Sequence, residues 1–431
     1  DRPMLGGNAS SEIRVWSGGE TRYDLVRELR GRFTNSDANL ALCDARRMRI
    51  VADETNIALR VNTRAFGVEK NADGTIASVK ALDLKRNRVV RFEAPLFCDA
   101  TGDGWVGYWA GADWRMGREA KSEYGESLAP EKADGDTLGA SLMWTSEDGN
   151  APVPFSAPWA EPRANGIVAV AGEWNWEYGI HQDMIAQAEE IRDRLLLAIY
   201  GAFSRAKKRK VHANRVLAFC PYLLGKRESR RLLGDWIFSE RDVTEKRLFP
   251  DAIATGSWSV DLHYDDCKKG VDFLTTCRQP HYGRYWIPYR SIYSRNVPNL
   301  FMAGRCFSCT HVGLGSPRVI CTLSQLGVAA GVFPLKVAGA VGKVRVQLLH
   351  LTLKGLLQRA AFLDKGVVQL RRAVFKGVFK LPDGRGMGRR EASDFPPHPG
   401  IKLAHLLGKF PREGFRADRK STRLNSSHGS I

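Results

Sequence analysis

Apolar and polar positions change most sharply between residues 299 and 331. The run Asn299-Leu-Phe-Met-Ala303 predicts a short buried strand that ends at Gly304-Arg305. The positions that follow are mostly Cys, Ser, Thr, His and Gly, which predicts a polar loop, and from Arg318 the pattern becomes helical, with small residues from Gly327 to Gly331. Free N–H groups at a helix N-terminus favour an anionic ligand, and small residues let a flat cofactor approach the backbone closely.

Alternating apolar and polar residues mark a second region, over residues 56–92. Ile57 to Val68, Thr75 to Leu84 and Arg88 to Phe92 alternate, and Asn71-Ala-Asp-Gly74 is a turn signal between the first two runs. This pattern predicts a three-stranded β-meander.

Helical spacing predicts two further elements. A short helix is expected from Tyr23 to Arg32, and a longer amphipathic helix is expected over residues 181–203. The apolar positions of the longer helix are Met184, Ala188, Ile191, Leu195, Ala198 and Ala202. A basic run, residues 205–210, follows it. We interpret this run as a solvated helix end favoured by the helix dipole, with nucleic-acid binding as the alternative.

Composition places the chain among globular proteins of one large domain or two to three ordinary ones. It has 431 residues, of which 43% are hydrophobic. No apolar run reaches the roughly 18 residues that a membrane helix needs, so we expect a soluble protein without an integral membrane segment. The sequence does not indicate its compartment or its oligomeric state. The chain opens with Asp1 rather than Met, and we expect that its native start is missing.

Charge is distributed unevenly along the chain. Of the net +18, residues 331–431 contribute 20 Lys and Arg against 6 Asp and Glu, which is +14, and residues 1–330 contribute 45 against 41, which is +4. A nearly neutral body argues against a nucleic-acid partner for that part of the protein.

Eight cysteines are present, and only Cys306 and Cys309 form a C-x-x-C. This pair is either a redox pair or a pair of structural residues, and we favour the structural role. Zinc is not expected because a second C-x-x-C is missing, and no metal site is predicted.

The stretch from residue 287 to 331 resembles the C-terminal flavin motif of FAD-dependent oxidoreductases of the two-dinucleotide-binding-domain type. Five motif elements occur in order and with the family's spacing: Pro288-Tyr-Arg290, Asn299 to Arg305, Ser308-Cys-Thr-His311, Arg318-Val319 and Gly327 to Gly331. The resemblance implies FAD as cofactor. It also implies that several residues of this stretch lie at the cofactor: Gly304, Arg305, Ser308, Thr310, Arg318 and Val319.

Two earlier segments resemble other elements of the same family. The first, just after the family's second strand, is Leu5-Gly6-Gly7-Asn8, which the resemblance places near the diphosphate and the ribityl chain. The family has roughly 35 residues upstream of it, with the first strand, G-x-G-x-x-G and first helix, and these are missing here. The second is Ala100-Thr101-Gly102-Asp103-Gly104, which the resemblance implies is also in contact with the cofactor.

A literal G-x-G-x-x-G occurs within the second segment, at Gly102, Gly104 and Gly107. We do not interpret it as the first diphosphate loop, because no second strand with an acidic end follows about 20 residues later. A further family motif, Gly225 to Asp235, contains two acidic and four basic residues. It predicts a network of ion pairs that serves either as a clamp between domains or in substrate binding.

The resemblance implies an α/β fold. We expect an FAD-binding, Rossmann-like parallel sheet whose first βαβ unit is missing, a β-meander and an inserted mixed α/β substrate domain. The expected parts are a partial FAD-binding domain at 1–124, a substrate domain at 125–285 and a C-terminal FAD-binding segment at 286–331. Residues 332–417 form a basic tail, either a frame-slipped sequence or a membrane-surface segment. Residues 418–431 resemble a translated sequencing adapter and are expected to be non-native.

The resemblance implies FAD-dependent oxidation or reduction of a small organic molecule by hydride transfer. We predict that Arg284 and Tyr285 line the substrate pocket and that His311 takes or gives a proton. One alternative is a truncated, non-catalytic remnant that binds FAD weakly or not at all. The other is a membrane-surface or nucleic-acid binder that acts through the basic tail.

Overall fold

The structure is a computed structural model that describes residues 2–30, 37–264 and 270–340. The chain divides into two compact units, residues 1–370 and 371–431, and every described residue lies in the first. The predicted tail at 418–431, nearly all of the tail at 332–417 and Cys267 lie outside the described residues.

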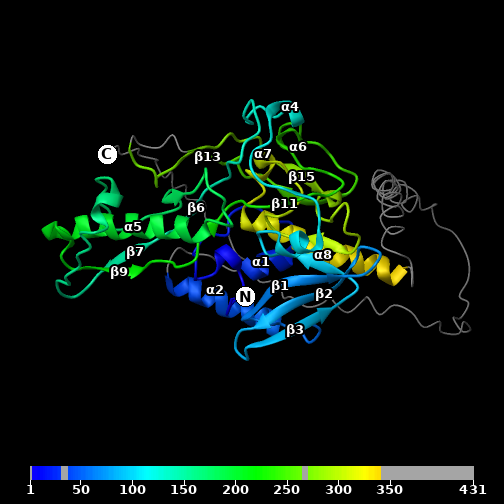
Figure 1. The fold of residues 1–431 in the computed structure, drawn as a ribbon, viewed down its shortest axis with the longest axis horizontal. Coiled ribbons are helices and arrows are strands. Elements are labelled where there is room, and N and C mark those ends of the chain that lie inside the picture. Colours follow the sequence, from blue (N-terminus) through cyan, green and yellow to red (C-terminus); the bar gives the residue numbers. More distant parts are fainter. Residues whose placement is uncertain (1, 31–36, 265–269, 341–431) are drawn as a thin grey trace, which may run out of the picture. The chain divides into compact units, whose positions relative to one another are not determined.

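Helices and strands alternate irregularly along the described part, which is mixed α/β (Figure 1). The helices are α1 (Asp24–Arg30), α2 (Asp37–Ala52), α3 (Trp105–Ala110), α4 (Lys121–Tyr124), α5 (Ala188–Lys207), α6 (Glu240–Thr244), α7 (His311–Leu314) and α8 (Ile320–Ala340). The strands up to residue 148 are β1 (Thr63–Lys70), β2 (Ile76–Asp83), β3 (Arg88–Glu93), β4 (Phe97–Asp99), β5 (Trp114–Arg115), β6 (Ala140–Ser141) and β7 (Thr145–Asp148). The later strands are β8 (Glu177–Tyr178), β9 (Arg215–Phe219), β10 (Gly225–Lys226), β11 (Arg231–Leu232), β12 (Ala252–Gly256), β13 (Leu262–Tyr264), β14 (Thr276–Arg278), β15 (Tyr285–Pro288) and β16 (Leu300–Met302).

The strands β1, β2 and β3 form an antiparallel sheet in that order, where the sequence predicts a meander. Asn299, just before β16, joins this sheet to the rest of the molecule. Its side-chain oxygen accepts a hydrogen bond from the Ile76 amide at 2.9 Å, and its amide nitrogen donates to the carbonyls of Ile76 and Pro95 at 2.9 and 3.3 Å. The meander is therefore held against the strand that begins the flavin-like motif.

Helix α5 buries the apolar face that its spacing predicts, since Ile191, Leu195 and Ala198 are fully buried. It begins at Ala188 and not at residue 181. The carboxylate of Asp183 accepts hydrogen bonds from the amides of Ile185 and Ala186, which closes a turn ahead of the helix. The helix ends in the basic run, and Lys207 donates to the carbonyls of Ala213 and Arg215 there.

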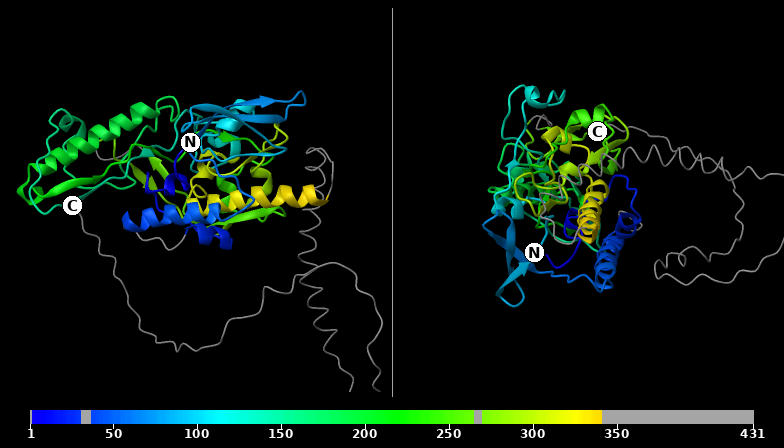
Figure 2. Two further views of the ribbon diagram at one scale, coloured as in Figure 1. Left: turned by 90° about the horizontal axis from the view of Figure 1, so that it is seen from below. Right: turned by 90° about the vertical axis from the view of Figure 1, so that its right-hand side faces the viewer.

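Three groups of buried apolar residues stabilise the described unit. One surrounds α5 and contains Trp144, Trp176 and Phe203. A second lies between β12, β15, α7 and α8, and a third lies under the meander and α3. Helix α1 contacts both α2 and α8, as Figure 2 shows (blue and yellow). Within the residues that were described, no helix is long and apolar enough to cross a membrane.

Parallel pairing forms one ladder in the described part of the chain, between β4 and β16. Leu300 lies opposite Phe97, and Met302 lies opposite Asp99. Because both strands run in the same direction, the loops that follow them leave from the same edge.

Candidate functional site

Two glycine-containing loops leave the carboxyl ends of β4 and β16 side by side. The amide of Ala303 donates to the Asp99 carbonyl at 2.9 Å. The buried carboxylate of Asp99 shapes the first loop by accepting hydrogen bonds from the amide and hydroxyl of Thr101 and from the amide of Gly107. Ligands in open α/β folds bind at this kind of edge, beyond the carboxyl ends of parallel strands.

Asp103 links both loops to the charged motif at residues 225–235. Its carboxylate lies 2.6 Å from a terminal nitrogen of Arg305 and 3.0 Å from Lys226 Nζ, and it accepts the Ser229 hydroxyl at 2.8 Å. Burial alone would raise the pKa of Asp103, but the charges of Arg305 and Lys226 outweigh it and lower the pKa to about 2. Asp103 is therefore a carboxylate at every pH at which the protein is expected to work.

The segment at residues 5–8 is connected to the same centre. The side-chain amide of Asn8 donates to the Lys226 carbonyl at 2.9 Å. Gly7 and Gly304 both have positive φ, 54° and 99°, and a Cβ added at either would meet no heavy atom within 4 Å. These two glycines leave accessible backbone that a ligand can approach.

The chemistry of the donors fits an anionic dinucleotide. Four buried guanidinium Nε atoms have no hydrogen-bond partner among the described residues, and two of them belong to predicted cofactor residues, Arg305 and Arg318; the others are in Arg205 and Arg231. A buried guanidinium N–H without an acceptor is costly, and a phosphate oxygen is a strong acceptor for it. Arg305 thus has a donor to spare next to the accessible backbone of Gly304, and Arg318 has one beside Asp261 and His263.

The predicted cofactor residues fall into two groups. Those of the first group are at least partly accessible: Leu5, Gly6, Gly7, Asn8, Ala100, Thr101, Asp103, Gly304, Arg305, Arg318 and Val319. Those of the second group are buried: Gly102, Gly104, Ser308 and Thr310. Ser308 donates to the Trp236 carbonyl, and Thr310 caps α7, so both hydroxyls are used within the protein.

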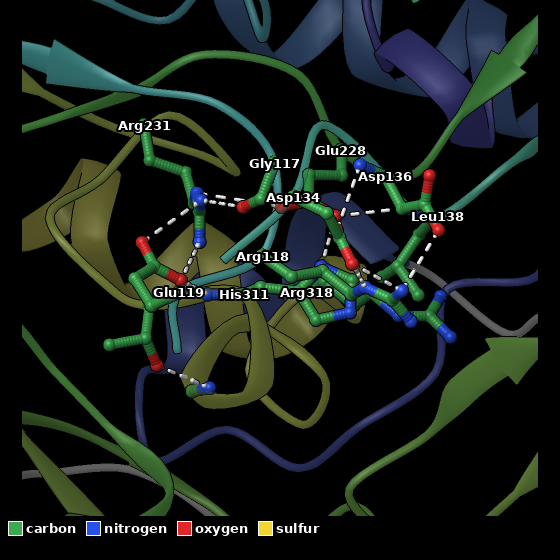
Figure 3. A network of polar contacts seen from close by, with 12 residues as sticks. Gly117, Arg118, Glu119, Asp134, Asp136, Leu138, Glu228, Arg231, His311 and Arg318 are labelled. Carbon is green, nitrogen blue, oxygen red and sulfur yellow. Dashed lines mark hydrogen bonds and ion pairs between the residues drawn. The ribbon is translucent and has the colours of Figure 1, made fainter. Parts of the chain in front are cut away.

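His311 lies in a buried polar network at the start of α7 (Figure 3). Its Nδ1 is 2.8 Å from the Glu228 carboxylate, and its backbone amide donates to Glu119 at 2.8 Å. Arg231, which is fully buried, lies 3.1 Å from Glu119 and 3.4 Å from Glu228. Because a carboxylate only accepts hydrogen bonds, Nδ1 of His311 carries a hydrogen, and Nε2 is the nitrogen that can exchange a proton.

The charged groups of this network stabilise the ionised form of Glu228. Burial alone would raise the pKa of Glu228, but His311 and Arg231 hold the pKa below its usual value. Glu228 also accepts the amide of Leu138 at 2.8 Å. Glu228 is thus an ionised partner that orients the imidazole.

A second buried polar cluster surrounds His263. Its Nδ1 lies 2.5 Å from the Glu177 carboxylate, and its Nε2 lies 3.2 Å from Asp261 and 3.1 Å from an Arg318 nitrogen. Arg227 lies 3.4 Å from Glu177. Burial would raise the pKa of Glu177, yet Arg227 and His263 lower it to about 2. The cluster connects a motif arginine, Arg318, to the strand pair β13–β14.

Arg284 and Tyr285 are not brought together with His311 in this network. Arg284 is exposed and forms an ion pair with Glu20 at 2.9 Å. Tyr285 is fully buried, and its hydroxyl lies 2.7 Å from that of Ser316. An added Cβ at Gly256 would lie 2.2 Å from that hydroxyl, so the ring fills its site closely.

Cys306 and Cys309 are both fully buried. Burial raises the pKa of each thiol well above its usual value. Each Sγ lies within reach of a backbone carbonyl, Asp99 O for Cys306 and Phe307 O for Cys309. Protonated, enclosed thiols react slowly, which favours the structural role for this pair.

Sequence reasoning missed the glutamates that surround α7. Glu119 and Glu126 come from a loop-rich acidic stretch, and their partners His311 and Thr310 lie 192 and 184 positions further along the chain. The signal that could have indicated them is the charge of the motif at residues 225–235. Its four basic residues outnumber its two acidic ones, Glu228 and Asp235, so burying the motif requires carboxylates from elsewhere in the chain. No group of three or more potential metal ligands was found in the described part.

Residues 1–335 match the model of a protein family described as FAD dependent oxidoreductase. No curated protein and no solved structure matches the chain.

Proposed function

The chain belongs to the family of FAD-dependent oxidoreductases, which use FAD as cofactor, and we propose that it transfers a hydride between FAD and a small organic substrate. Family membership confirms the resemblance that the five motif elements predict. One observation carries the proposal: Asp103 and its partners join the loops at 5–8, 100–104 and 304–305 at one sheet edge, where the buried Nε of Arg305 has no hydrogen-bond partner in the described structure.

The residues that would hold FAD are those with accessible backbone or unused donors. We assign Gly7, Asn8 and Gly304 to close approach of the backbone, and Arg305 and Arg318 to its anionic part. We also propose that β4 and β16 belong to a Rossmann-like parallel sheet, and that residues 125–285 face the substrate.

FAD, when bound, supplies the hydride acceptor or donor. His311 holds or moves the accompanying proton at Nε2, because Glu228 fixes Nδ1 as the donor nitrogen. Glu119 and Arg231 keep the imidazole in place, since they hold its backbone and its carboxylate partner. Of the three residues predicted to be catalytic, His311 carries the proposal, while Arg284 and Tyr285 lie in separate surroundings.

The first test is the absorption spectrum of the purified chain before and after addition of FAD and desalting. We expect flavin bands that remain with the protein. Arg305→Ala removes a charged donor and is expected to weaken FAD binding about tenfold or more. Arg241→Ala is the matched control, because Arg241 is exposed on α6 and pairs with Glu245. A protein that stays colourless after addition of FAD would favour the non-catalytic remnant.

The second test concerns the proton. Once a substrate has been found by screening for flavin bleaching, His311→Ala is expected to slow flavin reduction by roughly 100-fold or more, the range for a lost general acid or base. His212→Ala serves as control, because His212 lies in a short turn after α5. Flavin reduction at the unchanged rate in His311→Ala would remove His311 from the mechanism.

A further inference from the structure

Glu126 is a buried carboxyl group that the proposed mechanism does not use. It is 1% exposed and follows the short helix α4. Its Oε1 accepts two hydrogen bonds, from the Thr310 hydroxyl at 2.5 Å and from the Glu240 amide at 2.7 Å. Its Oε2 is buried and has no hydrogen-bond partner in the described structure.

This asymmetry between the two oxygens determines where a proton would bind. A carbonyl oxygen with two lone pairs is satisfied by the two donors at Oε1. An ionised Oε2 would be a buried anionic oxygen without a donor, which is strongly unfavourable, whereas a hydroxyl at Oε2 removes that charge. The geometry therefore favours the neutral acid, with the hydrogen on Oε2.

Two neighbouring carboxylates, Glu119 and Glu240, also favour the neutral acid at Glu126. Glu240 of α6 is 2% exposed, and Glu119 of the preceding loop accepts the His311 amide. Burial raises the pKa of Glu126 to about 7; the hydrogen bonds from Glu240 N and Thr310 lower it, and the carboxylates of Glu119 and Glu240 raise it. Other titratable or charged groups near it are Tyr124, Glu228, Arg231, Arg241, Cys309 and His311.

Thr310 connects Glu126 to the helix that carries His311. The Thr310 oxygen accepts the Gly313 amide at 2.8 Å and caps α7, so its hydrogen is free to be donated to Glu126. His311 is the first residue of α7. Among the hydrogen bonds that Glu126 makes to described residues, the one from the Thr310 hydroxyl joins the carboxyl group directly to the helix start.

We propose that Glu126 is a positioning residue that binds a proton at Oε2 in the working protein and, through Thr310, holds the start of α7 and with it His311. The role in the reaction rests on the proposed function. The proton and the link to α7 do not rest on it.

The test uses the full chain and two measurements that do not require a substrate. Infrared difference spectra taken across neutral pH report the carbonyl stretch of a neutral carboxylic acid. We expect this band to be lost with a midpoint near pH 7. The amide NMR signal of Gly313 should shift with the same midpoint, because the Gly313 N–H donates to the Thr310 oxygen and Thr310 transmits the change to α7.

Three variants make the outcome decisive. Glu126→Gln mimics the neutral acid, so the band disappears and the Gly313 amide signal no longer shifts with the midpoint of that band. Thr310→Val should keep the acid band, but the Gly313 amide signal should no longer shift with the midpoint of that band. Glu123→Gln is the control, since Glu123 lies on α4 and its side chain is 37% exposed in an ion pair with Arg115, and it should behave like the unmodified chain.

Two results would overturn the proposal: a missing acid band in the unmodified chain, or a Gly313 amide signal that still titrates with the original midpoint in Glu126→Gln. If Glu126→Gln does not fold, Thr310→Val provides the test. A Gly313 amide signal that still shifts with the midpoint of the acid band in that variant would contradict the link through Thr310. A chain that shows the titration but never binds FAD would contradict the proposed function alone. A flavin-containing chain without the band would contradict this inference alone.

Discussion

At the scale of single residues, Asn299 shows how one polar side chain can fix the position of a whole sheet. It is 3% exposed and makes three hydrogen bonds to the backbone around the meander. Asn299→Ala leaves one amide and two carbonyls without these partners, so we expect the free energy of unfolding to fall by about 3 kcal/mol. Urea unfolding followed by circular dichroism measures it.

Asn71→Ala is the matched control at this scale. Asn71 lies in the turn of the meander, and its side chain donates to the exposed Thr75 hydroxyl at 2.9 Å. Water can replace that bond, so we expect a loss below about 1 kcal/mol. Equal losses in the two variants would show that Asn299 does not carry the attachment of the meander.

At the scale of elements, the close approach of α5 to the turn at residues 161–164 depends on Gly201. A Cβ at this position would lie 2.3 Å from the Ala160 carbonyl oxygen and 3.1 Å from the Ala164 Cβ. Because the nearest atom belongs to the backbone of Ala160, it cannot move away without a large energetic cost. Gly201→Ala is therefore expected to reduce the free energy of unfolding by about 1–3 kcal/mol, although alanine favours a helix.

Gly327→Ala on α8 gives the opposite expectation for the same substitution. No heavy atom lies within 4 Å of the added Cβ there. The helix should gain up to about 1 kcal/mol from the better helix former. A thermal melt of both variants compares them, and a stabilised Gly201→Ala protein would disprove the proposed contact with the turn.

Across the whole molecule, local patterns in the sequence predicted local structure. The strand–loop–helix at β16 to α8, the apolar face of α5 and the alternation of the meander could all be anticipated, because each depends on neighbouring positions. Helix α2 was not anticipated, and among its described side chains the buried ones include a charged pair, Arg47 with Asp44 at 3.1 Å, which apolar periodicity does not indicate. The pairs around α7 join residues more than 180 positions apart, and periodicity carries no information about such pairs.

Those distant pairs also determine how the stability of the whole molecule changes with pH. Burial raises the pKa of Glu126 from 4.5 to about 7, so its stabilising contribution is complete below pH 4.5 and is lost as the pH rises through 7. The shift corresponds to about 3 kcal/mol. Asp103 and Glu177, with pKa values lowered to about 2, act in the opposite sense and lose their contribution as the pH falls towards that value. We therefore expect maximum stability in mildly acidic solution.

Urea unfolding at a series of pH values measures this dependence, and Glu126→Gln isolates one side of it. Glutamine does not ionise, so the variant should keep its free energy of unfolding between pH 4.5 and 7, while the unmodified chain loses about 3 kcal/mol over the same interval. The acid side should remain the same in both proteins, because Asp103 and Glu177 are unchanged. Parallel curves over the whole range would mean that Glu126 titrates in the folded protein as it does in the unfolded chain, and that its burial has no energetic consequence.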